Sequence, residues 1–369
     1  MMNEAGHIYA KAGVDYSKMD PVKVLAQQKA AQTAKNLKTF GMNEIVASRG
    51  ESAYVWEEPN SYRSLVIEGL GTKNLIADEM RNITGKTYYD KIAQDAVAMI
   101  VNDLIVVGAM PQVVNAYFAI GESDWMSDKK RAKDLVNGWA TACNAIGATW
   151  GGGETPTLKG VIEPATIDIG GAAIGIIQPK SHLVLGEKLT DGDAVVLIES
   201  SGIHANGITL VRKMAESLPK GYGTKMTANK MLGEVLLTPT HLYVSLVRDL
   251  LKADLDLHYM VNITGHGWRK LMRANKKLTY EFTSLPKPQP EFDFIQKTLK
   301  ISDQEMYASF NMGAGFAIYL PKSQAKQVVT VAKQNQLRAW VCGEVKKGPK
   351  RVIIKSKGIT YKADTMEVR

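Results

Sequence analysis

The chain has 369 residues, of which 45% are hydrophobic and 22% are charged. This composition is ordinary for a folded globular protein, and the length favours two domains over a single hydrophobic core. The net charge of +9 would suit nucleic-acid binding, but the basic residues are spread out, apart from residues 128–133 and 346–362, and few aromatic residues stand among them. We interpret these two segments as solvated surface and expect no nucleic-acid partner.

The cysteines and the first residues bear on the compartment. Cys143 and Cys342 have no Cys or His at metal-ligand spacing, so both are expected to be core thiols in a reducing environment. The first residues lack the basic and apolar segments of a signal peptide, and no apolar run reaches the roughly 20 residues of a membrane helix. We therefore expect a cytoplasmic protein without membrane contact.

Caps, glycines and apolar runs predict mixed strands and helices along the whole chain. In the first half, the expected elements are a helix from Asp20 and Pro21 to Gly41, strands over 51–59 and 64–67, a helix from Asn74, a helix over 95–108, a strand over 112–120, a helix over 127–146, and strands over 148–150 and 166–178. In the second half, they are strands over 193–199, 277–282, 313–320, 339–345 and 351–354, and helices over 208–216, 241–252, 290–299 and 323–334. The pattern predicts two α+β domains, residues 1–178 and 179–369.

The stretch from residue 94 to residue 111 is apolar but carries three polar residues, Asp95, Asn102 and Asp103. Burying an unpaired carboxylate costs several kcal/mol, so these groups must meet a cation, a hydrogen-bond network or solvent. In a helix, Asp95 and Asn102 are seven residues apart and lie within about 20° of one face. Local capping and a metal or phosphate site explain this stretch equally well.

Glycine-rich turns after strands bring backbone N–H groups close to phosphate oxygens. One such turn follows Glu68 and ends at Lys73, which places a carboxylate, a hydroxyl and an ammonium within six residues. Glu154 follows three glycines. Oxygen ligands without histidine or thiolate indicate Mg²⁺ rather than zinc or iron.

Several motifs occur in an order that resembles aminoimidazole ribonucleotide synthetase, also called phosphoribosylformylglycinamidine cyclo-ligase. The resemblance starts at residues 9–15, runs to about Val345, and is carried by residues 69–73, 95–104, 152–155, 200–207, 263–265 and 306–315. It implies two α+β domains, the first of which pairs its sheet with that of a second subunit to form a β-barrel in a homodimer. It also implies an ATP- and Mg²⁺-dependent enzyme of purine biosynthesis. Such an enzyme cyclises formylglycinamidine ribonucleotide, a phosphorylated small molecule, after phosphorylating its formyl amide oxygen.

The resemblance also implies site residues. Those expected to bind ATP are Gly69, Gly71, Thr72, Lys73, Asn102, Asp103, Gly152 and Gly153. The expected metal ligands are Glu68, Asp95 and Glu154. The residues expected to face the substrate are Ser200, Ser201, Gly202, His204, Asn206, Gly207, Thr264, Gly265 and Gly267. Lys73, Asp95 and His204 are the expected catalytic residues; His204 stands in a polar glycine loop, where a histidine has access for proton transfer.

The chain departs from the family pattern at some positions. It has Glu68 where the family has Asp, Asn262 where it has His, and His266 where it has Gly, and residues 157–159 replace Glu-Met-Pro. Local structure is the default interpretation of His266. Two alternatives stay open: another ATP-using member of the superfamily with a different amide or phosphoryl acceptor, and a non-catalytic nucleotide-binding paralogue.

Overall fold

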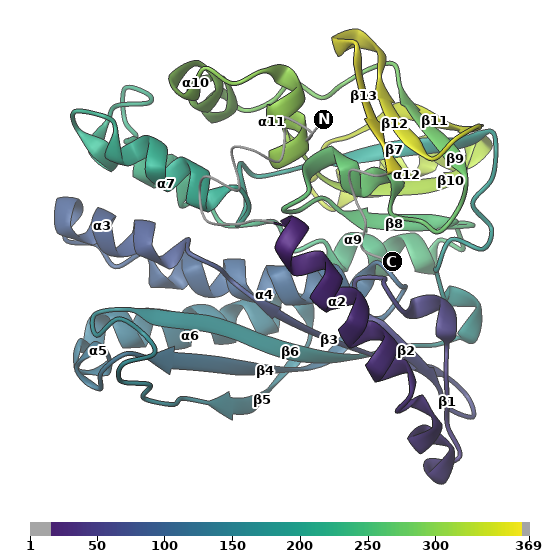
Figure 1. Ribbon diagram of the computed structural model, residues 1–369, viewed down its shortest axis with the longest axis horizontal. Helices are drawn as coiled ribbons and strands as arrows, with labels where there is room; N and C mark the ends of the chain where they lie inside the picture. Colours follow the sequence, from purple (N-terminus) through teal and green to yellow (C-terminus); the bar gives the residue numbers. More distant parts are fainter. Residues whose placement is uncertain (1–15, 364–369) are drawn as a thin grey trace.

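The computed structural model describes residues 16–363, so the motif at residues 9–15 lies outside the described residues. The chain forms a six-stranded and a seven-stranded sheet, each with its own helices. Figure 1 shows the first sheet below, the second above, and helix α4 between them. The two predicted α+β units are confirmed.

The first sheet has the strand order β1-β2-β3-β6-β4-β5, in which only β4 and β5 run parallel. Its strands are β1 (Asn43–Glu44), β2 (Tyr54–Glu57), β3 (Tyr62–Gly69), β4 (Met110–Ile120), β5 (Thr149–Glu154) and β6 (Ile167–Ile177). The helices of this half are α2 (Tyr16–Ala31), α3 (Asn74–Thr84), α4 (Tyr89–Ile105), α5 (Asp124–Ser127) and α6 (Lys129–Ile146), with 3₁₀ segments η1 (Ala34–Phe40) and η2 (Val46–Ser48).

The second sheet has the order β13-β12-β9-β11-β7-β10-β8. Its strands are β7 (Asp193–Glu199), β8 (Tyr259–Asn262), β9 (Leu278–Phe282), β10 (Ala314–Pro321), β11 (Ala339–Lys347), β12 (Arg351–Ile354) and β13 (Ile359–Lys362). Its helices are α7 (Ile208–Glu216), α8 (Leu232–Leu236), α9 (Val244–Lys252), α10 (Pro290–Leu299), α11 (Asp303–Ser309) and α12 (Ala325–Gln334), with 3₁₀ segments η3 (Lys180–His182), η4 (Gly221–Gly223), η5 (Gly267–Met272), η6 (Lys322–Gln324) and η7 (Lys355–Lys357).

Helix α4 is the centre of the molecule, because it packs on β3 and β6 of the first sheet and also contacts α9 and β8 of the second domain. Helix α6 packs closely beside it. Gly138 permits this approach, since a Cβ at that position would lie 2.6 Å from the Cα of Asp90. A helix covered on several sides must be mostly apolar, and its few polar residues must find partners inside the protein.

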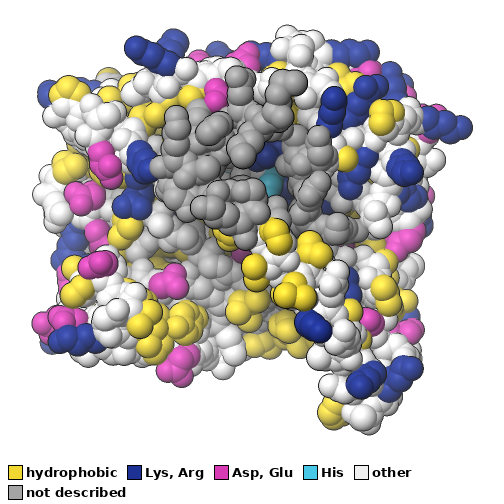
Figure 2. All heavy atoms as spheres, viewed as in Figure 1, with side chains coloured by type: hydrophobic (Ala, Val, Ile, Leu, Met, Phe, Trp, Pro, Cys, Tyr) yellow, Lys and Arg dark blue, Asp and Glu magenta, His cyan; other side chains and the backbone are white. Residues whose placement is uncertain are grey.

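The first sheet has one covered face and one open face. On β3, Val66 is buried towards the helices, whereas Leu65 is 44% and Ile67 79% exposed on the other face. Figure 2 shows hydrophobic side chains gathered in the lower half of the view, over α2 and the first sheet. An apolar sheet face in contact with water is typical of an interaction surface.

Four sequence expectations need correction. Helix α2 already includes Tyr16, and the expected helix to Gly41 is interrupted after Ala31. The glycines before Glu154 belong to strand β5 rather than to a loop. Residues 346–362 are not simply a solvated tail: besides β12, which matches the strand expected over 351–354, they include strand β13, which buries Ile359 and Tyr361. The two corrections to helix α2 are boundary errors. Strand β13 has a period-two pattern of buried and exposed residues that the many lysines around it made hard to recognise.

Among residues 16–363, no helix combines the length and the apolar character needed to cross a bilayer.

Candidate active site

The polar residues of α4 join the two domains. Asn102 donates from Nδ2 to the carbonyl of His241 at 2.8 Å and accepts from the backbone N–H of Tyr243 at 3.0 Å. Asp103 accepts from Nδ2 of Asn262 on β8 at 2.7 Å. The expectation that these groups meet a hydrogen-bond network is confirmed, and the network lies in the second domain.

Asp95 forms a fully buried ion pair with Lys73, at 2.8 Å between Oδ2 and Nζ. The other carboxylate oxygen accepts hydrogen bonds from the backbone N–H and the hydroxyl of Thr240, and Lys73 donates to the carbonyl of Thr238 at 3.0 Å. Burial lowers the pKa of Lys73 and raises the pKa of Asp95, and the ion pair opposes both shifts. The pair therefore connects the start of α3, helix α4 and residues 238–240 of the second domain.

A cleft of about 580 Å³ lies between the domains. Its lining comes from the end of β3, helix α4, the loop after β7 and the segment after β8. The lining residues are Lys23, Glu51, Ser52, Glu68, Gly69, Leu70, Gly71, Met99, Asp103, Ala205, Asn206, Thr264, His266, Lys270 and Arg273.

Charges of both signs meet in this cleft. Burial and the Asp103 carboxylate together raise the pKa of Glu68 to about 7, while Lys270 and Arg273 oppose this rise. Lys270 lies in η5, is 7% exposed and donates to the hydroxyl of Thr264. Burial lowers the pKa of Lys270, and the nearby Asp103 opposes this shift. The carboxylates of Glu68 and Asp103 in one cleft provide the oxygen ligands that a divalent cation prefers.

Arg273 holds part of the first domain over the cleft. Its guanidinium donates to the carbonyl of Gly50 at 3.2 and 3.0 Å and to the hydroxyl of Ser52 at 3.0 Å. Tyr259 of the second domain donates to Glu51 at 2.8 Å. Residues 50–52 are thus fastened to the opposite domain at consecutive positions.

His266 also lines the cleft, although the sequence was interpreted as giving it a local structural role by default. Burial, followed by the charges of Arg269 and Lys270, lowers the pKa of His266 to about 3. The imidazole is therefore neutral at physiological pH, and it contributes polar contacts rather than charge.

The loop from Ser200 to Gly207 is held by one internal bond and by bonds to other segments, among them Asn311 and Pro239. His204 adopts φ +59°, is 2% exposed, and accepts a hydrogen bond from the backbone N–H of Ser201 at 3.1 Å. Burial lowers the pKa of His204 well below its usual value, with smaller contributions from His241 and Lys73. His204 does not line the cleft, whereas Asn206 of the same loop does.

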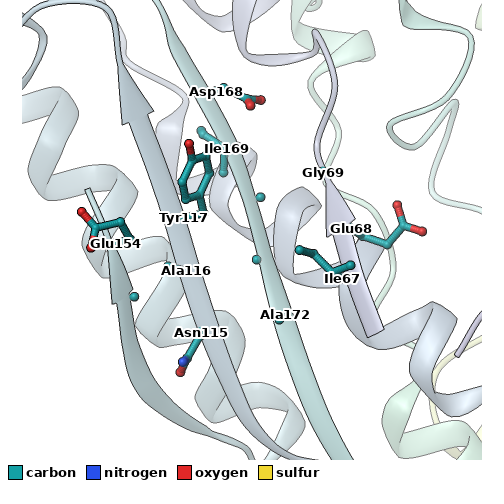
Figure 3. Close-up of a pocket in the computed structure, with 13 residues that line it drawn as sticks. Ile67, Glu68, Gly69, Asn115, Ala116, Tyr117, Glu154, Asp168, Ile169 and Ala172 are labelled. Atoms are coloured by element: carbon teal, nitrogen blue, oxygen red, sulfur yellow. The ribbon is translucent and has the colours of Figure 1, made fainter. Parts of the chain in front are cut away.

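Glu154 does not line the cleft between the domains. Figure 3 shows Glu154 on β5 and Glu68 on β3, which is three strands away in the same sheet, and the two carboxylates point away from each other. Strands β6 and β4 separate them, a distance of roughly 14 Å at the usual strand spacing. Both line a second hollow, of about 490 Å³, with Tyr117 and Asp168. Among the described residues, no group of three or more His, Cys, Asp or Glu side chains is placed to hold a metal ion.

The structure thus divides the predicted site residues into groups. Those that line the cleft are Glu68, Gly69, Gly71, Asp103, Asn206 and Thr264. The buried groups outside its lining are Lys73, Asp95, Asn102 and His204. Gly153 and Glu154 line the hollow on the sheet, and Gly152 precedes them on β5. The remaining predicted residues line neither cavity: Thr72, Ser200, Ser201, Gly202, Gly207, Gly265 and Gly267.

Among the residues that sequence reasoning missed are Glu51, Lys270 and Arg273 in the lining of the cleft, and Tyr259, which donates to Glu51. A signal for two of them was present, because Lys270 and Arg273 stand three and six residues after Gly267, the last residue of the glycine loop that was expected to face the substrate. Basic residues at the start of the segment after such a loop are candidates for anion contacts.

Comparison with known proteins agrees with this architecture. The family described as AIR synthase related protein matches residues 50–177 with its N-terminal domain and residues 190–355 with its C-terminal domain. The phosphoribosylformylglycinamidine cyclo-ligase of Methanocaldococcus jannaschii is 34% identical over 343 residues, which cover 91% of each chain. A chain of a HypE–HypF complex shares the fold with a TM-score of 0.61 at 19% identity, over 85% of this chain and 93% of that one. The hydrogenase maturation protein HypE in complex with ATP has a TM-score of 0.56 at 18% identity, over 73% of this chain and 78% of that one. The chain therefore belongs to the AIR synthase family.

Proposed function

We propose that the protein is an ATP-dependent cyclo-ligase that converts formylglycinamidine ribonucleotide to 5-aminoimidazole ribonucleotide in purine biosynthesis. The observation that carries this proposal is the 34% identity to a cyclo-ligase over 91% of both chains. The cleft supports it, because it offers carboxylates and cations together, as a magnesium nucleotide and a phosphorylated substrate require.

The reaction explains why ATP is needed. The oxygen of the formyl amide is a poor leaving group until it is phosphorylated. The amidine nitrogen then attacks the carbon that carries this oxygen, and phosphate leaves as the ring closes. Catalysis of phosphoryl transfer depends mostly on positioning and on neutralising charge. The protein must therefore hold two phosphorylated molecules in line and keep water away from the activated intermediate.

The residues present fit a magnesium ion. Glu68 and Asp103 share the cleft, and Mg²⁺ is usually held by one or two carboxylates together with phosphate oxygens and water. The ion would neutralise phosphate charge when bound. Asp95 is already engaged by Lys73 and Thr240, so we assign it to positioning.

The chain's own groups have distinct tasks in this scheme. Residues 50–52, fastened by Arg273 and Tyr259, cover the cleft and restrict the access of water. The Lys73–Asp95 pair and Asn102 fix the second domain against α4, and so hold both walls of the cleft at a constant separation. A constant separation is what in-line transfer between two bound molecules needs.

We further propose a homodimer that buries the open face of the first sheet. The exposed Leu65, Ile67 and Tyr117 on that face support it. In a dimer, the hollow that contains Glu154 would face the partner subunit, and Glu154 would have a different environment.

We also propose that the domain boundary lies at residues 178 and 179, between strands β6 and β7. We further propose a cytoplasmic location, with which the unpaired Cys143 and Cys342 agree.

The test is direct: purified protein is incubated with ATP, Mg²⁺ and formylglycinamidine ribonucleotide, and the aminoimidazole product is followed. We expect product that depends on all three components, with one ATP consumed for each product molecule. ATP binding without product would contradict the proposal and would favour a paralogue with another acceptor.

A further inference from the structure

The Lys270 ammonium has fewer partners than its burial requires. It is 7% exposed, and its hydrogen-bond acceptor among the described residues is a neutral hydroxyl, that of Thr264. No carboxylate of residues 16–363 forms an ion pair with it within 4.0 Å. An ammonium has three donor positions, and a buried cation without a counter-ion is costly.

Asn206 is in a similar state. Its Nδ2 is buried and has no hydrogen-bond partner, although most buried polar atoms in folded proteins have one. Asn206 and Lys270 come from different parts of the second domain, the loop after β7 and the segment η5, and both line the same cleft. Two residues whose donors lack sufficient acceptors therefore line the same cleft.

Two other cations near this site, Arg273 and Lys73, are already engaged. Arg273 donates to Gly50 and Ser52, and Lys73 is paired with Asp95 outside the lining of the cleft. Lys270 thus has donor capacity to spare, and it has the charge that an anion needs.

The carboxylates of Glu68 and Asp103 limit where an anion can bind in the cleft. Glu68 and Asp103 belong to the first-domain side of the cleft, and they repel a bare phosphate. Lys270 and Asn206 belong to the second-domain side. A phosphate group that enters the cleft is therefore most stable against the second-domain side, where a charged and a neutral donor can each take one of its oxygens.

We propose that Lys270 and Asn206 form a phosphate-binding subsite, in which Lys270 supplies the charge and Asn206 a neutral donor. The identity of its ligand rests on the proposed function: the phosphate is either the terminal phosphate of ATP or the phosphate of the ribonucleotide. Either source presents the same terminal oxygens to the subsite.

The experiment measures binding by isothermal titration calorimetry at pH 7.5 with three probes: inorganic phosphate, the magnesium complex of a non-hydrolysable ATP analogue, and formylglycinamidine ribonucleotide. The variants are Lys270→Met, which keeps the bulk without the charge, and Lys270→Arg, which keeps the charge. Lys277→Met is the matched control, because Lys277 is an exposed lysine seven residues further along the chain.

We expect Lys270→Met to weaken the binding of inorganic phosphate and of at least one nucleotide probe about 10- to 100-fold, the usual effect of one charge-assisted hydrogen bond. Lys270→Arg should stay within about threefold of the wild type for the same probes. Loss with the ATP analogue would assign the subsite to ATP, and loss with the ribonucleotide would assign it to the substrate. Equal affinities of wild type and Lys270→Met for all probes would overturn the proposal, as would a similar loss in Lys277→Met.

A second measurement separates binding from folding. Because Lys270 is a buried cation with one neutral acceptor, Lys270→Met should unfold at the same temperature as the ligand-free wild type or at a higher one. Failure of the proposed function would look different: wild-type protein would form no aminoimidazole product, while its phosphate binding still depended on Lys270.

Discussion

The buried pair of Lys73 and Asp95 gives the sharpest quantitative prediction. Replacing Lys73 by Met removes the ammonium 2.8 Å from Asp95 and leaves the carboxylate fully buried, with Thr240 as its remaining hydrogen-bond partner. Breaking a buried pair on one side destabilises proteins by about 3–5 kcal/mol. Since domains are stable by about 5–15 kcal/mol, this loss is a large fraction of the total.

The companion change, Asp95→Asn, supplies the control. In the double variant with Lys73→Met, no charge remains, and an amide oxygen can still accept from Thr240. We therefore expect the double variant to recover at least half of the stability lost by Lys73→Met. Urea denaturation followed by circular dichroism, with linear extrapolation to water, gives the four free energies of unfolding that the double-mutant cycle needs.

Two results would refute this reasoning. A loss below about 1 kcal/mol in Lys73→Met would show that the carboxylate is not dependent on the ammonium. A double variant as unstable as the sum of the single variants would show that the two groups are independent. Because Lys73 does not line the cleft, the folded double variant should also bind a magnesium–ATP analogue within about threefold of the wild type; a loss above tenfold would support the sequence-based assignment of Lys73 to ATP.

Three further predictions concern the cleft and the open sheet face. The pKa of Glu68 is raised from 4.5 to about 7 in the folded protein, so its contribution to stability is complete below pH 4.5 and is lost as pH rises to 7. Across this range, the free energy of unfolding of Glu68→Gln should rise by about 3 kcal/mol relative to that of the wild type in denaturation experiments. Parallel pH profiles of the two proteins would contradict this. Ile67→Lys should convert the proposed dimer to a monomer in sedimentation velocity, whereas Val136→Lys, on α6 and 45% exposed, should leave it intact. A dimer that persists in Ile67→Lys would exclude this face as the interface. Arg273→Ala should speed amide hydrogen exchange in residues 48–53 at least tenfold, because the bonds to Gly50 and Ser52 disappear, and unaltered exchange would show that other contacts hold this segment.

The sequence was a good guide where a local signal and the tertiary structure agree. Strand β7 has the predicted bounds, because a run of apolar residues is flanked by Asp193 and by the small residues after Glu199. The polar residues of α4 were correctly expected to need partners. The identity of those partners could not be predicted, since Thr240, His241 and Asn262 follow them by more than 130 residues and are brought close by domain packing.

Other features were visible but were given too little weight. Ser302 and Glu305 form the capping box that begins α11, and this motif can be recognised in the sequence. Strand β13 alternates buried Ile359 and Tyr361 with exposed residues, but the surrounding lysines suggested a solvated tail. The glycines of β5 were interpreted as a turn that brings backbone N–H groups close to phosphate; here a Cβ at Gly153 would lie 2.0 Å from the carbonyl oxygen of Ala116 on the paired strand β4.

The central position of α4 also limits how the protein can move. A hinge motion between the two sheets would have to break the bonds from Asn102 to residues 241 and 243, those from Asp95 to Thr240, and the bond between Asp103 and Asn262. These bonds lie along one helix and are buried, so they would have to open together, without water to replace them. We therefore expect the two domains to move as one rigid body during turnover. Entry and exit of ligands would then depend on surface segments such as residues 50–52, whose contacts can open one at a time.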